Sequence, residues 1–247
     1  MATAAKTVNK ATATQAIAEA KKAQIATPIT ASDDVGVASI TIPELETHTV
    51  HVPIIGLSPL IQHAWAPKSL KAILKGMGPK SDIKPAREPK DPKAEFEAAK
   101  YLLEDGTPGH PCVAFKAATV NACSLYGKEV TKVGMKTALF FHGEGPQMLV
   151  PLEFDECVMR EDTPRVGMGS IDLRYRPAYH GWKCVLKVDF MPHVINLNSV
   201  LAIINAGGLG GVGEWRPSSP KSNSGVYGRY KIDPNANIEV FSNQDTE

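Results

Sequence analysis

The segment NAGGLGGVGEWRPSSPKSNSGVYGRYKI, from Asn205 to Ile232, is the most distinctive part of the chain, and we call it the glycine-rich segment. It contains seven of the 20 glycines, and it joins a helical pattern, NLNSVLAIINAGG, to a short strand pattern, SGVYGRYKID. Glycine allows positive φ and close backbone approach, so such a turn can present main-chain N–H groups to a phosphate chain. A flexible loop with glycine helix caps would have the same composition. A dinucleotide-binding fingerprint fits poorly, because its glycines follow a strand and precede a helix.

Basic and aromatic side chains accompany these glycines. Residues 207–232 carry four basic residues against the single acidic residue Glu214. Cations can neutralise phosphates and aromatic rings can stack on bases, so the segment is a candidate contact for nucleic acid. Its candidate residues are Trp215, Arg216, Lys221, Tyr227 and Arg229, with Tyr230 and Lys231 beside them.

Hydrophobic periodicity predicts alternating strands and helices in the rest of the chain. The expected elements are a strand over 47–57 closed by Gly56, a helix over 58–76 capped by Ser58 with Pro59 in its first turn, helices over 91–106 and 110–127, strands over 137–143, 147–154 and 172–190, a helix over 196–208 and a strand over 224–233. Alternate residues from Trp182 to Val188 share one face. This order is typical of an α+β fold, whose simplest form is a ferredoxin-like core.

The composition is that of an ordinary globular protein. Of 247 residues, 43% are hydrophobic and 21% are charged, and the net charge of +1 excludes a uniformly basic, histone-like surface. No apolar run approaches the roughly 18 residues of a membrane span, and the N-terminus lacks an apolar export signal. We therefore expect a cytoplasmic protein without membrane contact. The four cysteines form no CxxC pair, which predicts free thiols rather than a zinc module or a disulfide scaffold.

Differences in composition predict the domain boundaries. Residues 1–47 are rich in Ala, Thr and Lys, so we expect an arm that is flexible or that orders against a neighbouring subunit. Residues 48–233 carry the α+β pattern, and 234–247 are expected to form a C-terminal tail. Within the domain, 66–93 has eight basic and three acidic residues, which predicts an exposed basic insertion.

Two further groups of basic residues are candidates for the same nucleic-acid surface. A Lys-rich loop is more often a plain solvated surface, and strand arginines can equally form ion pairs, here with Asp172 or Glu161. If the fold brings these groups to the glycine-rich segment, they would line one groove. The candidates are Lys68, Lys71, Lys75, Lys84 and Arg87 in the insertion, and Arg160, Arg165, Arg174 and Arg176 before the last helix.

No catalytic or metal-binding pattern stands out. His48 and His51 point to opposite sides of a strand, and the other histidines are scattered, so no metal site is predicted. The chain has neither a Walker lysine nor a serine in a nucleophile elbow. We therefore expect no enzyme activity and no cofactor. A metal-dependent nuclease is an alternative.

Three stretches resemble the RAMP proteins, an RRM-related superfamily that includes the repeating backbone subunits of CRISPR effector complexes. They are the glycine-rich segment, the Pro-led helix HPCVAFKAATVNACSLYG with Lys116 near its start, and MREDTPRVGMGSIDLRYRPAYHGWKCVLKVDF with its arginines. The likeness spans Val50 to Asp233. It implies a ferredoxin-like, RAMP-type core that binds single-stranded nucleic acid, with Lys116 among the contacts. It also implies subunits stacked head-to-tail in a helical filament, with the basic insertion 66–93 acting as a thumb that covers the bound nucleic-acid strand.

Three shorter stretches resemble a group of uncharacterised tailed-bacteriophage and prophage proteins. They are IIGLSPLIQHAW, MREDTPRVGMGSIDLRYRP and GVGEWRP. Together the resemblances predict a homo-oligomer that binds single-stranded DNA or RNA without sequence preference. Its expected role is phage replication, recombination or annealing in the cytoplasm of a bacterial host cell. The alternative is a virion structural or assembly protein that does not bind nucleic acid.

Overall fold

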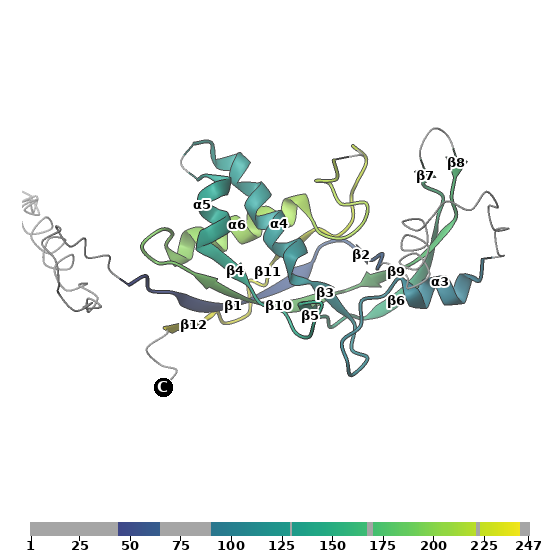
Figure 1. Cartoon of the computed structure of the whole chain (residues 1–247), viewed down its shortest axis with the longest axis horizontal. Coiled ribbons are helices and arrows are strands. Elements are labelled where there is room, and N and C mark those ends of the chain that lie inside the picture. Colours follow the sequence, from purple (N-terminus) through teal and green to yellow (C-terminus); the bar gives the residue numbers. More distant parts are fainter. Residues whose placement is uncertain (1–43, 65–89, 129, 167–169, 221–222, 243–247) are drawn as a thin grey trace, which may run out of the picture. The chain divides into compact units, whose positions relative to one another are not determined.

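The computed structural model describes residues 44–64, 90–128, 130–166, 170–220 and 223–242 (Figure 1). Residue contacts divide the chain into two units, Met1–Glu46 and Thr47–Glu247, and the helices and strands below lie in the second unit. The expected N-terminal arm lies outside the described residues up to residue 43, as do the candidate residues Lys68, Lys71, Lys75, Lys84, Arg87 and Lys221.

Two long strands form the centre of the main sheet. β1 (His48–Gly56) and β10 (Lys183–Phe190) pair antiparallel, and their core-facing side chains alternate with side chains that are more exposed. Both the strand expected at 47–57 and the alternation expected after Trp182 are confirmed. The buried residues of the two strands are Val50, Val52, Ile54, Cys184, Leu186, Val188 and Phe190.

Three shorter strands complete this sheet. β4 (Leu139–Phe141) pairs with β10, and β11 (Tyr230–Ile232) pairs with β1. The strand order is therefore β11-β1-β10-β4, with antiparallel neighbours throughout. β12 (Glu239–Ser242) pairs with the other half of β1. Residues 234–247, expected to form a C-terminal tail, thus include a strand of the main sheet.

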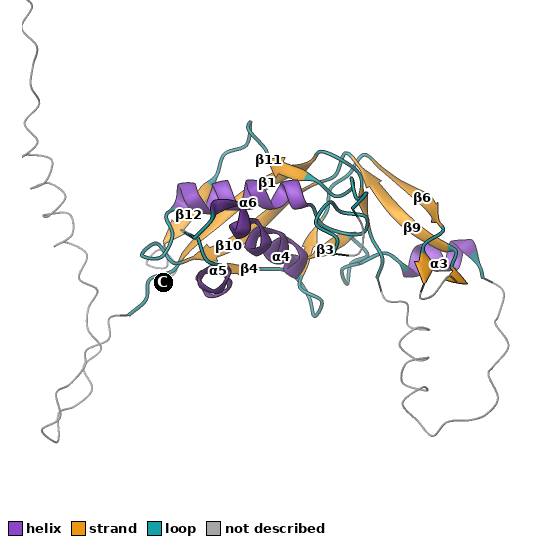
Figure 2. Ribbon diagram, turned by 90° about the horizontal axis from the view of Figure 1, so that it is seen from above, coloured by secondary structure: helices purple, strands orange, loops and turns teal. Residues whose placement is uncertain are grey.

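Helices cover one face of the main sheet (Figures 1 and 2). α4 (Cys112–Ala122), which continues as the 3₁₀ turn Cys123–Tyr126, packs against α6 (Leu197–Gly210). α5 (Lys132–Ala138) contacts α4 and β4. In chain order, β1, α4, β4, β10, α6 and β11 follow a β-α-β-β-α-β pattern. The expected α+β class is therefore confirmed.

A second antiparallel sheet has the order β2-β9-β6, and α3 packs against β9. Its elements are β2 (Leu60–Ile61), β6 (Glu156–Asp162), β9 (Arg174–His180) and α3 (Pro92–Ala98). Two small pairs join β3 (Gly109–Pro111) to β5 (Leu149–Pro151) and β7 (Arg165–Val166) to β8 (Ser170–Ile171).

The helix expected over 58–76 does not form at residues 58–64, the part of it that the structure describes. Ser58 and Pro59 instead connect β1 to β2. The Ser58 hydroxyl accepts a hydrogen bond from the Arg229 N–H at 3.0 Å, and the Pro59 carbonyl accepts one from the Gly228 N–H at 2.8 Å. Because the glycine-rich segment occupies these groups, Ser58 does not cap a helix.

Other boundaries also differ from the expected ones. The strand expected over 172–190 is two strands, β9 and β10, divided near Gly181, where φ is +59°. The helix expected over 91–106 is the shorter α3. The sequence pattern does not predict β6 or α5, although Thr131 is an N-cap signal for α5, since its side chain accepts the Gly134 N–H at 3.1 Å.

The cysteines are free thiols, as expected. Within the described ranges, no helix combines the length and the hydropathy that a transmembrane span needs. No group of three His, Cys, Asp or Glu residues that could hold a metal ion occurs among the described residues.

Candidate nucleic-acid interface

Main-chain hydrogen bonds hold the glycine-rich segment against β2. The Glu214 N–H donates to the Ile61 carbonyl at 2.9 Å, and within the segment the Val212 N–H donates to the Gly228 carbonyl at 2.9 Å. At Gly213, φ is +75°, and a Cβ atom would lie 2.5 Å from the Ile61 oxygen. Only glycine accepts both the positive φ and this close approach.

Many main-chain N–H groups of this segment already have acceptors within the protein. They are therefore not available to a phosphate, and the predicted main-chain cradle is wrong for these groups. The N–H groups in question belong to Gly211, Val212, Glu214, Ser218, Ser219, Tyr227, Gly228 and Arg229. What the segment offers to a ligand is its side chains and one wall of a pocket.

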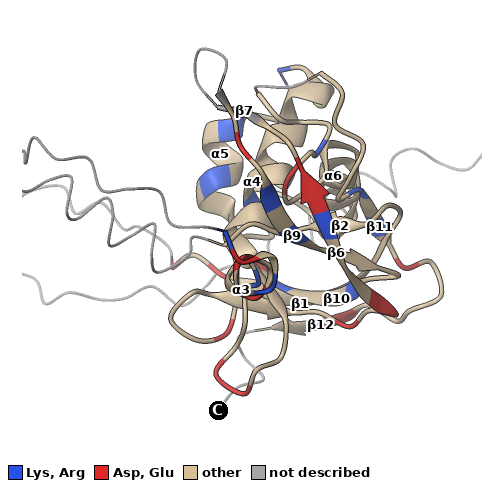
Figure 3. Ribbon diagram, turned by 90° about the vertical axis from the view of Figure 1, so that its right-hand side faces the viewer, with Lys and Arg blue, Asp and Glu red and all other residues tan. Residues whose placement is uncertain are grey.

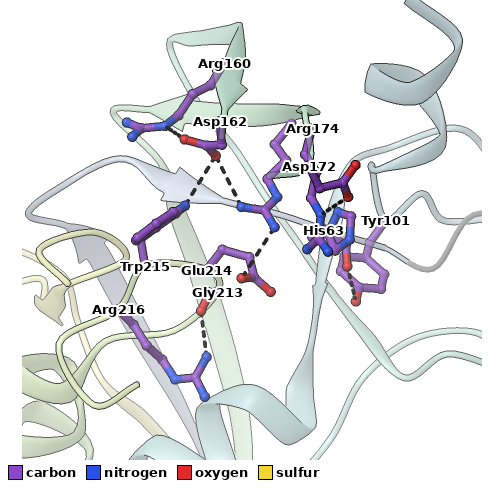
Figure 4. A network of polar contacts seen from close by, with 11 residues as sticks. His63, Tyr101, Arg160, Asp162, Asp172, Arg174, Gly213, Glu214, Trp215 and Arg216 are labelled. Carbon is purple, nitrogen blue, oxygen red and sulfur yellow. Dashed lines mark hydrogen bonds and ion pairs between the residues drawn. The ribbon is translucent and has the colours of Figure 1, made fainter. Parts of the chain in front are cut away.

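Asp162, at the end of β6, connects two arginines to the glycine-rich segment (Figure 4). Its side chain is 4% exposed, and it accepts hydrogen bonds from Arg160 Nε at 2.7 Å, Arg176 Nη1 at 3.2 Å and the Trp215 indole N–H at 3.3 Å. Arg176 is 2% exposed, and its Nη2 lies 3.8 Å from Glu214 Oε2. Arg176 therefore positions its neighbours, because its own guanidinium does not reach the surface.

Arg160 also reaches the glycine-rich segment directly. Its Nη1 donates to the Tyr227 hydroxyl at 2.6 Å, and its guanidinium carbon lies 4.6 Å from the centroid of the Tyr227 ring. This placement combines a hydrogen bond with a cation–π contact. The fold thus brings an arginine of β6 to the glycine-rich segment, which the groove hypothesis requires.

Arg174 forms the ion pair that was the alternative to nucleic-acid contact. Asp172 accepts hydrogen bonds from Arg174 Nε at 3.0 Å and from Lys90 Nζ at 2.7 Å. The hydrogen bond from Lys90, and after it the one from Arg174, lowers the pKa of Asp172. Figure 3 shows Lys and Arg interleaved with Asp and Glu around β6 and β9. This part of the surface is therefore mixed in charge.

Trp215 has a strained backbone. Its φ is +54°, a conformation that costs a bulky residue roughly 1–2 kcal/mol. Its indole is bound to Asp162, and its carbonyl accepts the Tyr227 N–H at 3.1 Å. Backbone strain that the surrounding contacts maintain is concentrated at functional sites. The hydrogen bonds of Trp215 therefore maintain a backbone conformation that is unfavourable by itself.

A pocket of about 300 Å³ opens between α4 and the glycine-rich segment, and we call it the α4 pocket. Its apolar wall includes Val113, Ala114 and Ala117 of α4. Its polar side chains include His63, Tyr101, His110, Glu214, Arg216 and Ser218.

His110 lies in the wall of the α4 pocket with one ring nitrogen unpaired. Gln62 accepts the Tyr101 N–H with its amide oxygen and donates from its amide nitrogen to the Gly109 carbonyl at 2.7 Å. That same nitrogen lies 3.4 Å from His110 Nδ1, so Nδ1 accepts and Nε2 carries the proton. Nε2 has no partner among the described residues. Burial, and then the charge of Arg216, lowers the pKa of His110 to about 3, so the ring is neutral near pH 7.

Arg216 and the first turn of α4 make one end of the pocket positive. Arg216 Nη1 donates to the Gly213 carbonyl at 2.8 Å, and no other acceptor contacts the guanidinium among the described residues. α4 begins after Pro111 without a side-chain cap. The N–H groups of its first turn, at Val113 and Ala114, therefore keep the partial positive charge of a helix N-terminus. An anion suits this end of the pocket.

The other predicted residues are not gathered at this pocket. Lys116 does not line it, and its Nζ lies 5.7 Å from the centroid of the Phe140 ring. Arg229 is exposed, and its side chain has no hydrogen bond or ion pair with the described residues. Arg165 lies on β7, and its side chain lies outside the description. The structure thus joins Arg160, Trp215 and Tyr227 in one network around Asp162, whereas Arg216 lines the α4 pocket.

Sequence patterns do not single out two residues of the pocket. His110 is one of several scattered histidines, although it directly precedes the Pro-led start of a helix. Glu214 is the only acidic residue of the glycine-rich segment, and that isolation is a signal that the sequence does contain.

Comparisons with known proteins find weak structural likeness. No protein-family model and no curated protein matches the chain. The chain is similar to a chain in the cryo-EM structure of the type III-B Cmr-beta bound to cognate target RNA, with a TM-score of 0.40 and 11% identity over 80% of this chain and 61% of that chain. It is also similar to Cmr6 from Pyrococcus furiosus, with a TM-score of 0.39 and 9% identity over 77% of this chain and 100% of that chain. At this level of similarity, function has to be inferred from the geometry of the chain itself.

Proposed function

We propose that this protein binds single-stranded nucleic acid at the surface formed by the α4 pocket and the glycine-rich segment. The observation that carries the proposal is the α4 pocket, where Arg216 and the uncapped first turn of α4 occur together. Hydrogen-bond donors and positive potential in one concave site suit a phosphate group of a strand.

Aromatic side chains beside the pocket suit the bases. Trp215 and Tyr227 are partly exposed, and Arg160 lies over the Tyr227 ring. Stacking of a base on an aromatic ring contributes about 1–3 kcal/mol and tolerates any base. Arg229 adds an exposed cation to the same segment. These features support binding by charge neutralisation and stacking, without chemistry on the strand.

The main sheet also bears on this proposal. Its order β11-β1-β10-β4 and the β-α-β-β-α-β connection support a ferredoxin-like core of the RRM and RAMP type. Together with the sequence resemblances, this core extends the proposal to subunits that stack head-to-tail into a filament on the strand. The proposed role is phage DNA replication, recombination or annealing, with the basic insertion 66–93 over the strand.

Fluorescence polarisation with labelled oligo-dT and oligo-U tests the proposal. The logarithm of the affinity should fall with the logarithm of the salt concentration, with a slope of about −0.7 for each phosphate neutralised. Replacement of Arg216 and Arg229 by Ala should weaken binding to both strands and make the slope shallower by about one to two units. Binding that does not respond to salt would contradict the proposal.

A matched variant separates the site from net charge. Lys128→Ala/Lys136→Ala removes the same two positive charges from exposed positions that do not line the α4 pocket. Its affinity should equal that of the wild type. If both double variants bind equally weakly, overall charge rather than this surface accounts for binding, and the proposed site is wrong.

A further inference from the structure

The α4 pocket contains two opposite charges that do not pair with each other. Arg216 and Glu214 both line it, and no ion pair joins them in the described part of the chain. Glu214 is 43% exposed, and one of its oxygens lies 3.8 Å from Arg176 Nη2. In Figure 4, Arg216 lies on one side of Glu214, and His63 and Tyr101 lie on the other. A phosphate alone would use only the positive part of this pocket.

Glu214 keeps capacity to accept hydrogen bonds. A carboxylate has two oxygens and about four acceptor positions, and the only ion pair or hydrogen bond of the Glu214 side chain among the described residues is the long one to Arg176. The Tyr101 hydroxyl donates elsewhere, to the His63 carbonyl at 3.5 Å. The charge of Glu214 nevertheless acts on this tyrosine, because it adds to the effect of burial in raising the pKa of Tyr101. A ligand with N–H donors would therefore complete this side of the pocket.

A nucleotide carries both an anion and an edge of hydrogen-bond donors. Guanine presents its N1–H and its 2-amino group side by side, which matches the two oxygens of a carboxylate. Cytosine and adenine present one amino group on this edge. Thymine and uracil place carbonyl oxygens on both sides of their single N–H, and these oxygens repel a carboxylate. In a single strand, this edge of the base is free to be bound.

We infer that the α4 pocket takes one nucleotide of the bound strand, with its phosphate against Arg216 and the first turn of α4 and its base edge against Glu214, and that guanine is preferred. A volume of about 300 Å³ corresponds to a small ligand site rather than to a long groove. The inference rests on the proposed function and adds a base preference to it, because stacking and backbone contacts alone do not distinguish bases.

Changes in the strand test this preference with the protein unaltered. The full chain is titrated with oligo-dT, with the same strand carrying one central deoxyguanosine, and with the same strand carrying deoxyinosine, which lacks the 2-amino group. The guanine strand should bind roughly tenfold more tightly than oligo-dT, and deoxyinosine should lose most of that gain. Equal binding of all three strands would overturn the inference and leave the proposed function intact. No binding to any strand would overturn both.

A change in the carboxylate tests the role of Glu214. Glu214→Gln should abolish the guanine preference, measured as the ratio of the affinities for the guanine strand and for oligo-dT. Glu153→Gln makes the same change at a carboxylate that is 77% exposed and does not line the pocket, and it should keep the preference. A preference that survives Glu214→Gln would overturn the assignment. Free guanosine monophosphate should bind more weakly than the guanine strand, and equal affinity would assign the pocket to a free nucleotide instead.

Discussion

At the scale of single residues, Asp162 is the group on which the interface depends most. One buried carboxylate binds Arg160, Arg176 and the Trp215 indole, so it holds β6, β9 and the glycine-rich segment in one arrangement. Removal of its charge leaves the buried Arg176 with only the long contact to Glu214. The arrangement predicts that this position is sensitive both in folding and in strand binding.

We expect Asp162→Asn to lower the free energy of unfolding by about 3 kcal/mol, because it removes one partner of a buried ion pair. Urea denaturation measures the loss, and fluorescence polarisation should show weaker strand binding as Trp215 and Arg160 lose their anchor. Asp155→Asn, at an exposed aspartate, should leave the stability unchanged. A loss for Asp162→Asn no larger than for this control would contradict the role of Asp162.

His110 makes the stability dependent on pH. Its pKa is about 3 in the folded protein and about 6.5 in the unfolded chain, so between these values the unfolded state binds the additional proton. Stability should therefore fall as the pH drops below about 6.5. In urea denaturation at a series of pH values, the wild type should lose up to about 1.4 kcal/mol per pH unit more than His110→Gln. Parallel curves for the two proteins would exclude a buried neutral ring.

At the scale of elements, α6 shows that packing explains much of the glycine content. A Cβ atom at Gly208 would overlap the Tyr230 carbonyl, whereas at Gly210 the nearest atom would be Ser218 Cβ at 3.3 Å. Gly208→Ala should destabilise the protein by about 2 kcal/mol through overpacking. Gly210→Ala should be neutral or stabilising by up to about 1 kcal/mol, because Ala favours helix. Similar unfolding midpoints for the two variants would refute this explanation.

Local patterns predict elements well where the element is decided locally. The alternation in β10 is visible in the sequence because neighbouring residues determine it. Ser58 carries a helix-cap signal, but its hydroxyl binds Arg229, which lies far along the chain. Glycine composition likewise cannot distinguish a phosphate cradle from close packing. The packing partner of Gly213 is Ile61, which also lies far away along the chain.

In the candidate site, too, residue types can be recognised from the sequence, whereas contacts between distant residues cannot. Arginines and aromatic residues are recognisable as types, so Arg160, Trp215, Arg216 and Tyr227 can be proposed from the sequence. The buried pairing of Arg176 cannot, because it depends on Asp162 and Glu214 of other elements. The pocket role of His110 cannot be predicted either, since it arises from burial beside Gln62 and Arg216.

At the scale of the whole molecule, the proposal makes assembly depend on nucleic acid. Light scattering after size-exclusion chromatography should show larger particles with an added single strand and smaller ones after nuclease treatment. A freshly purified filament should also contain bound nucleic acid, which the ultraviolet absorbance ratio of the sample would detect. An oligomer of fixed size that nuclease does not change would instead favour a virion structural or assembly protein.

Photo-crosslinking to a bound strand most directly tests whether nucleic acid lies at the glycine-rich segment. An oligonucleotide with thio-substituted pyrimidines is bound, irradiated and digested, and the crosslinked residues are identified by mass spectrometry. Crosslinks are predicted at Trp215 and Tyr227 and in the first turn of α4. Crosslinks confined to the exposed aromatic residues of the main sheet, Phe140 and Phe241, would contradict the proposed interface.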